Sequence, residues 1–136
     1  MPIEDDDAIR KILREAKTIA VVGASVKRWR DSNSIMQFLI DAGYKVLPIN
    51  PWYSEVLGIP CVPDLSHLPP GIDIVDVFRR PEALGPIVEE AITNGARTLW
   101  LQLGVVNVDA AKKAEQAGMS VIMDHCIRVD HRRLIR

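Results

Sequence analysis

Residues 18–43 read TIAVVGASVKRWRDSNSIMQFLIDAG, and this stretch decides the fold. Its first part, TIAVVG (18–23), is a short apolar run closed by glycine, which is typical of a strand buried on both faces of a parallel sheet. A basic loop follows, and then the pattern predicts a helix over 33–42 that stops at Gly43. Three residues before or at its start are candidate helix caps: Asp31, Ser32 and Asn33. The stretch therefore predicts a strand–turn–helix unit of the kind that binds phosphate groups.

Strands and helices alternate along the rest of the chain. Further strands are expected over 44–50, 73–78, 98–103 and 120–124. Helices are expected over 5–16, from Pro81 to Gly95, over 107–118 with Asn107 as its cap, and as a basic tail over 128–134. The proline- and glycine-rich segment 51–71 is expected to be mostly loop with one turn of helix. This alternation predicts the α/β class, as a Rossmann-like three-layer sandwich with a parallel sheet of about five strands.

Composition narrows the classes of protein that the chain can be. Its 136 residues, 48% of them hydrophobic, suit one domain over residues 1–136. Seventeen basic and 18 acidic residues give a net charge of −1, which argues against a nucleic-acid partner. The chain has no long apolar run, and its acidic N-terminus is unlike a signal peptide, so no membrane partner is expected. Cys61 and Cys126 are expected to be reduced thiols in a cytoplasmic protein.

Parallel sheets bind ligands beyond the carboxyl ends of their strands, near the point where the strand order reverses. Gly23 permits a tight turn there, and the free N–H groups at the start of the 33–42 helix can bind a phosphate. Lys27, Arg28 and Arg30 add positive charge beside this turn. A plain connecting loop with solvated charges is the alternative interpretation.

The loop does not match the common dinucleotide sites. An NAD site requires G-x-G-x-x-G, whereas this loop reads GASVKR from residue 23. It also requires an acid after the second strand, where this chain has Asn50. A Walker A sequence is absent, and the histidines and cysteines lack the spacing of metal ligands, so no metal is expected.

The other strand ends leave alternatives open. Arg79 and Arg80 suit phosphate oxygens, or they pair at the surface with Glu82 or Asp76. Phe78 and Pro51 can enclose a base, or Phe78 belongs to the core. For Gln102, the expected hydrogen-bond partner is a ligand or the Gly23 loop. For Cys126, the alternatives are a structural thiol and a nucleophile.

The segments IAVVGAS, GYKVLPINP, DIVDVFRRPE, LWLQLGVVN and MDHCIRVDHRRL resemble the small single-domain CoA-binding proteins of bacteria and archaea. This family is similar to the CoA-binding Rossmann domain of the succinyl-CoA synthetase α subunit. The resemblance covers residues 5–134. It implies that the protein binds coenzyme A or acyl-CoA as its small-molecule ligand, without chemistry of its own.

The resemblance also implies a set of ligand-binding residues. The turn under the pyrophosphate would be formed by Gly23, Ala24 and Ser25, and phosphates would meet Lys27, Arg30 and the helix start at Asn33 and Ser34. Asn50 and Pro51 would border the adenosine, with Phe78, Arg79 and Arg80 opposite. The floor would be completed by Gln102 and Gly104.

This chain departs from its relatives in two places. The basic loop of relatives is often proline-rich, like SPKPDR, whereas here it reads SVKRWR, with Arg28 and Trp29 in place of the pattern. Relatives usually carry arginine where this chain has His125. Three interpretations of Trp29 and Trp52 are open: they stack on adenine, they mark a partner surface, or they fold over the core.

Two further classes of function stay open on the sequence. One is a small oxidoreductase or a thiol-dependent enzyme that uses Cys126. The other is an interaction scaffold anchored by Trp29 and Trp52. A weak homo-oligomer is compatible with the sequence, and the protein partner is unknown.

Overall fold

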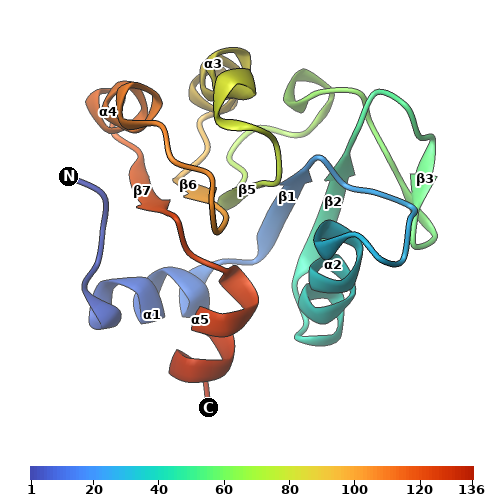
Figure 1. The fold of residues 1–136 in the computed structure, drawn as a ribbon, viewed down its shortest axis with the longest axis horizontal. Helices are drawn as coiled ribbons and strands as arrows, with labels where there is room; N and C mark the ends of the chain where they lie inside the picture. Colours follow the sequence, from blue (N-terminus) through green and yellow to red (C-terminus); the bar gives the residue numbers. More distant parts are fainter.

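The apolar runs of the sequence form one parallel sheet in the computed structural model, which describes residues 1–136 (Figure 1). Its five strands are β1 (Thr18–Val22), β2 (Lys45–Ile49), β5 (Ile74–Val77), β6 (Thr98–Leu101) and β7 (Ser120–Met123). They lie in the order β2-β1-β5-β6-β7, so the direction in which strands are added reverses between β1 and β5. Val22 pairs with Ile49 on one side and with Val77 on the other. The carboxyl ends of these three strands therefore lie side by side.

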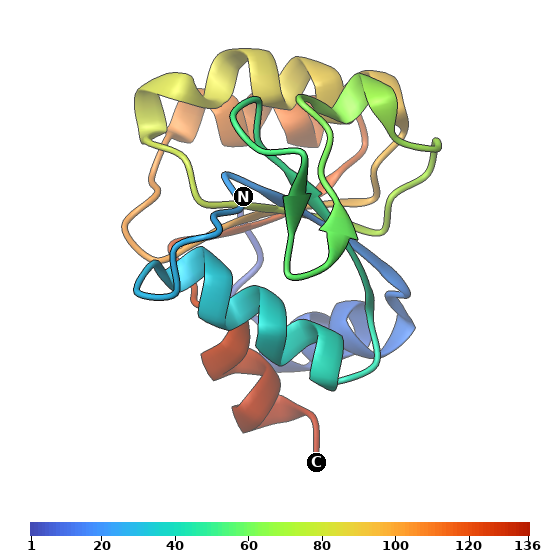
Figure 2. The same ribbon diagram turned by 90° about the vertical axis from the view of Figure 1, so that its right-hand side faces the viewer.

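Helices cover both faces of the sheet (Figure 2). They are α1 (Asp6–Glu15), α2 (Asp31–Asp41), α3 (Leu84–Asn94), α4 (Val108–Gln116) and α5 (Ile127–Leu134). In Figures 1 and 2, α3 and α4 lie on one face while α1, α2 and α5 lie on the other. This arrangement confirms the predicted Rossmann-like three-layer sandwich.

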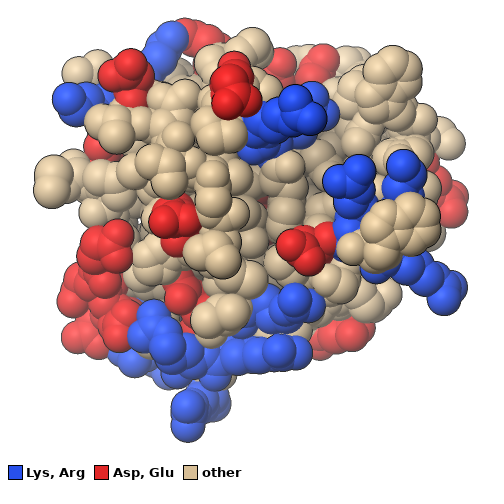
Figure 3. Space-filling model, in the orientation of Figure 1, with Lys and Arg blue, Asp and Glu red and all other residues tan.

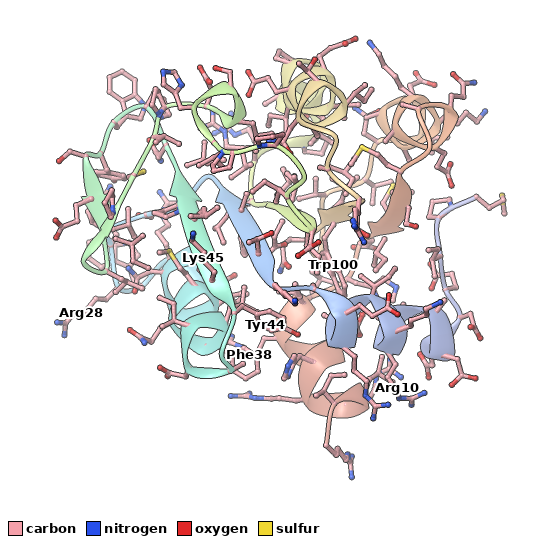
Figure 4. The ribbon with its side chains drawn as sticks, turned by 180° about the vertical axis from the view of Figure 1, so that it is seen from behind. Arg10, Arg28, Phe38, Tyr44, Lys45 and Trp100 are labelled. Atoms are coloured by element: carbon pink, nitrogen blue, oxygen red, sulfur yellow. The ribbon has the colours of Figure 1, made fainter.

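The alternation of side chains along each strand produces two hydrophobic cores. On β1, Ala20 and Val22 pack on the face of α3 and α4, whereas Ile19 and Val21 pack on the face of α1, α2 and α5. Trp100 of β6 belongs to the second core and is fully buried (Figure 4). Its indole N–H donates to the carbonyl oxygen of His125 at 2.9 Å, which satisfies its one polar atom and ties β6 to the chain before α5.

The start of α2 differs from the prediction. The helix begins at Asp31, the residue before it is Arg30, and no side chain caps it. Ser32 and Asn33 lie inside the first turn and are buried. Asn33 lies inside the helix and so cannot cap it, and its amide instead donates to the carbonyl oxygen of Ser25 at 2.8 Å. The capping prediction for this helix was therefore wrong, whereas the predicted Asn107 cap of α4 is confirmed.

The segment 51–71 is more ordered than expected. It holds the predicted single turn of helix, η1 (Leu65–His67), and also a short hairpin of β3 (Glu55–Val56) and β4 (Ile59–Pro60). The two residues between these strands, Leu57 and Gly58, both have positive φ. Leucine is a poor residue for such a turn, which is why the sequence did not indicate a hairpin.

The remaining short element is η2 (Pro81–Ala83), which leads into α3 with Pro81 in its first turn as predicted. No helix has the combination of length and apolar character that crossing a membrane requires.

Candidate functional site

A cavity of about 730 Å³ opens at the carboxyl ends of the strands, beside the reversal of strand order. We call it the candidate site. Its wall is formed by the β1–α2 loop, the start of α2, the ends of β2, β5 and β6, and the segment that enters α5. The volume is in the range of cofactor and small-molecule pockets. Eight of the residues predicted from the sequence line it: Gly23, Ser25, Lys27, Arg30, Asn50, Phe78, Arg79 and Gln102.

Gly23 makes the tight turn that the site requires. Its φ is +90°, a conformation that residues with a Cβ rarely adopt. A Cβ there would lie 3.1 Å from Cδ of Arg79 and 3.3 Å from the carbonyl oxygen of Phe78. The bare backbone of Gly23 therefore lets the end of β5 approach the turn and leaves the turn open to a ligand.

The candidate site is strongly cationic. Lys27, Arg30, Arg79 and Arg128 line it, against one carboxylate, Asp31. None of these four cations takes part in the ion pairs of the protein. Figure 3 shows lysine and arginine side chains gathered over the loop between β1 and α2. Unpaired cations at a concave surface attract anionic ligands.

Hydrogen-bond donors complement these charges. The backbone N–H groups of Asp31 and Ser32, in the first turn of α2, have no backbone partner. Ser32 lines the site, is only 5% exposed, and its hydroxyl bonds nothing in the protein. Free N–H groups, a hydroxyl and the positive end of a helix dipole are the features that bind phosphate.

Two predicted residues shape the loops through their side-chain amides. The Nδ2 of Asn50 donates to the carbonyl oxygen of Ala24 at 2.8 Å, and its Oδ1 accepts from the backbone N–H of Trp52 at 2.9 Å. The amide of Asn33 holds Ser25 in the same way. Ala24 itself is fully buried beneath the turn. These bonds fix the phosphate-type turn against the end of β2.

Several residues of the predicted set lie outside the wall of the candidate site. Arg80, which is exposed like Arg79, precedes η2 and does not line the site. Ser34 is one step further along α2, where its hydroxyl donates to the carbonyl oxygen of Asp31 and accepts from Arg128. The backbone N–H of Gly104 donates to Asp124 at 2.7 Å, while its neighbours Leu103 and Val105 line the site. Successive side chains diverge, so adjacency in sequence did not place these residues together.

Pro51 lines a second, smaller cavity of about 380 Å³. That cavity carries three carboxylates, Asp64, Glu82 and Glu90, and shares only Gly23 and Arg79 with the candidate site. Phe78 lines the candidate site alone, so Pro51 and Phe78 do not face each other across one cavity. Its acidic wall makes the second cavity unsuited to phosphate groups.

The surface ion pairs suggested for Arg79 and Arg80 are absent. Asp76 is fully buried in the middle of β5, and both of its carboxylate oxygens lack a hydrogen-bond partner. Burial raises the pKa of this carboxyl well above its usual range. Burial thus favours the uncharged form of Asp76, and Arg79 forms no ion pair.

Gln102 bonds a different partner from the one expected. Its Oε1 accepts from the backbone N–H of Ile127 at 3.1 Å, so it caps the start of α5 rather than the Gly23 loop. Its Nε2 makes no hydrogen bond in the protein, although the residue is 5% exposed and lines the site. The amide thus keeps a donor for a ligand.

Three further residues line the site that were not predicted from the sequence to bind a ligand: Arg128, Ser32 and Tyr53. Arg128 was assigned to a basic tail, but α5 packs on α1 and α2, which directs this side chain to the site. The signal available was its place two residues after the strand-end cysteine. For Ser32 and Tyr53 the sequence carries no comparable signal.

Trp29 and Trp52 are 78% and 83% exposed, so the interpretation that they fold over the core was wrong. Trp29 lines the site, with Nζ of Lys27 5.9 Å from its ring centroid, whereas Trp52 does not line it. Arg28 extends away from the molecule and does not line the site (Figure 4). No group of three or more His, Cys, Asp or Glu side chains is arranged to hold a metal ion.

The fold and the candidate site define a Rossmann-like α/β domain whose strand-end cavity attracts anions. The model of the family described as CoA binding domain matches residues 17–132, and the chain belongs to this family. The resemblance inferred from the sequence is thereby confirmed.

Individual relatives agree with this assignment. The chain is 42% identical over 123 residues to the uncharacterized protein YneT of Bacillus subtilis (strain 168), covering 90% of this chain and 91% of YneT. A solved structure, a hypothetical protein from Pyrococcus horikoshii OT3, is 42% identical with a TM-score of 0.95, covering 100% of this chain and 97% of that chain. The chain is also 26% identical over 121 residues to an ADP-forming acetate–CoA ligase of Archaeoglobus fulgidus. That match covers 82% of this chain and 18% of the ligase.

Proposed function

We propose that this protein binds coenzyme A or acyl-CoA in the candidate site, without chemistry of its own. The observation that carries the proposal is the convergence of four unpaired cations and the Gly23 turn in one cavity at the strand-order reversal. Membership of the CoA binding domain family supports the same ligand. In this proposal, residues 1–136 act as one CoA-binding domain in the cytoplasm.

The chemistry of CoA suits the two halves of the site. CoA carries a pyrophosphate and a ribose phosphate at one end, which suit Lys27, Arg30, Arg79, Arg128 and the first turn of α2. Its other end is an uncharged arm with two amides and a terminal thiol. The ends of β6 and β7 offer Gln102, Leu103, Val105 and Cys126 for that arm.

NAD fits the site less well. A dinucleotide site places a carboxylate after the second strand to bond the ribose hydroxyls. Here that place is held by Asn50, whose amide is already bonded to Ala24 and Trp52. The proposal therefore favours CoA over NAD for a reason of geometry as well as of motif.

The test is calorimetric titration of the protein with CoA, acetyl-CoA, NAD and ATP. We expect CoA to bind and Arg79→Ala to weaken it by about 1–3 kcal/mol, because a charge-assisted bond to phosphate is lost. Arg80→Ala is the matched control, since the neighbouring arginine does not line the site, and it should change affinity by less than about 0.5 kcal/mol. Binding of NAD but not CoA at millimolar ligand would sink the proposal.

A further inference from the structure

Cys126 lies between β7 and α5 and lines the candidate site. It is a free cysteine whose side chain makes no capping hydrogen bond, although it occupies the position before the first turn of α5. The N–H groups of Arg128 and Val129 in that turn lack backbone partners. Cys126 therefore lies beside the free N–H groups of this turn and in the wall of the candidate site.

The other cysteine is in a different environment. Cys61 does not line the candidate site, and its Sγ lies 3.6 Å from the carbonyl oxygen of Asn50. Burial raises the pKa of the Cys61 thiol, which lowers its reactivity. Cys61 therefore serves as a control for Cys126, because it is a second free thiol that lies outside the candidate site.

Gln102 points independently to a ligand beside Cys126. It lines the same cavity and is 5% exposed, its Oε1 accepts from the backbone N–H of Ile127, and its Nε2 makes no hydrogen bond in the protein. Only the two carboxylate oxygens of Asp76 are buried without a hydrogen-bond partner, so Nε2 of Gln102 keeps contact with solvent and can donate to a carbonyl oxygen of an amide-bearing arm. The apolar neighbours Leu103 and Val105 suit the methylene groups of such an arm.

The span between the two ends of the site matches the arm of CoA. The Gly23 turn ends β1, and Cys126 follows β7, with β5 and β6 between them. Three strand spacings amount to about 14 Å. The arm from the pyrophosphate to the sulfur of CoA has about a dozen bonds, equivalent to roughly four extended residues, which is also about 14 Å. A pyrophosphate at the turn brings the CoA sulfur to Cys126.

We propose that Cys126 captures CoA covalently, as a mixed disulfide formed by exchange with CoA disulfide. The Cys126 thiolate attacks one sulfur of CoA disulfide, a Cys126–S–S–CoA bond forms, and the original S–S bond breaks. The second CoA leaves as a thiolate with the electron pair, while the proton of Cys126 goes to solvent. Cys126 is oxidised and one CoA is reduced, so no other oxidant is needed. This inference rests on the proposed function, because the cavity must first bind CoA.

The experiment is intact-mass and peptide mass spectrometry of the reduced protein after incubation with CoA disulfide. The same experiment uses cystamine, a disulfide without the nucleotide, and the variants Cys126→Ser and Cys61→Ser. We expect one CoA adduct on the Cys126 peptide, its reversal by dithiothreitol, its retention in Cys61→Ser and its loss in Cys126→Ser. Binding should accelerate the reaction of CoA disulfide roughly 10- to 100-fold over cystamine, because the bound ligand raises the effective concentration.

Calorimetry of the wild-type protein with reduced CoA separates the two proposals. Binding of reduced CoA with no adduct, with an adduct on Cys61, or with equal rates for CoA disulfide and cystamine overturns the disulfide inference and leaves the proposed function standing. Absence of CoA binding overturns both. Peptide mapping of the wild-type protein locates the adduct even if Cys126→Ser fails to fold.

Discussion

At the scale of single residues, Asp76 is the most unusual side chain of the protein. It lies in β5 between Val21 of β1 and Trp100 of β6, with no exposed surface and no hydrogen bond to either oxygen. An ionised carboxylate in such a place is very costly, so burial favours the uncharged form and raises the pKa of Asp76. The free-energy cost of burying Asp76 therefore depends on pH.

The substitution Asp76→Asn should make this cost visible. Because the folded pKa of Asp76 is above its unfolded value of 3.8, its favourable contribution is complete below that value and is lost as the pH rises. Asparagine has a similar size and no charge. The free energy of unfolding of the variant, relative to that of the wild type, should therefore rise by roughly 1–3 kcal/mol between pH 4 and pH 7. Urea unfolding of both proteins across this range measures the difference. A difference that does not change with pH would contradict the prediction.

At the scale of elements, α5 is held in place by the N-terminal segment. Nδ1 of His125 lies 2.7 Å from Asp130, and its Nε2 lies 3.2 Å from Glu4. Arg133 donates to Asp6 at 2.7 Å and to Asp130 at 3.3 Å. Partial burial lowers the pKa of His125, but the hydrogen bonds to the two carboxylates outweigh it, so the pKa is raised. His125 therefore supplies this cluster with a charge that titrates.

Removal of this charge should destabilise the protein more in acid than in base. The pKa of His125 is raised on folding, so its contribution is complete below its unfolded value of 6.5 and is lost as the pH rises through the folded value. The variant His125→Gln should therefore lose about 0.5–1 kcal/mol more of unfolding free energy at pH 5.5 than at pH 8.5. Chemical denaturation at the two values measures this. Equal losses would show that His125 acts only by packing.

At the scale of the whole molecule, the candidate site draws on both ends of the chain. The β1–α2 loop provides Lys27 and Arg30, whereas Cys126 and Arg128 come from the entry to α5. A ligand that touches both must stabilise the fold that brings them together.

CoA should therefore raise the thermal midpoint of unfolding by several degrees. A ligand at 100 times its Kd adds about 2.7 kcal/mol of stability. The shift should shrink when salt is raised from about 0.05 M to about 0.5 M, because salt screens the cationic wall. Differential scanning calorimetry with CoA, and with NAD as the comparison ligand, measures both effects. A shift that is insensitive to salt would argue against recognition of phosphates at this wall.

The fold was predictable because each element leaves a local mark on the sequence. The five strands are short apolar runs such as TIAVV of β1, which is buried from both sides. Apolar residues repeat at helical spacing in α1 and α3, and Asn107 and Gly118 mark the ends of α4. The exceptions were also local. The hairpin of β3 and β4 turns at Leu57 and Gly58, and leucine is uncommon at a positive φ. The helix α2 begins at Asp31 without a side-chain cap, and Asn33 bonds Ser25 from inside its first turn.

The candidate site was predictable only in part. The sequence by itself determined which strand ends meet, since the alternation of strands and helices dictates a parallel sheet and glycine at position 23 marks the turn. Only the tertiary structure decided which side chains enter the cavity. Arg79 lines it while Arg80 does not, Gln102 keeps a free donor, and Arg128 arrives from α5. The reason is physical: backbone patterns are local, whereas the direction of each side chain at a strand end is set by packing against residues far away in the chain.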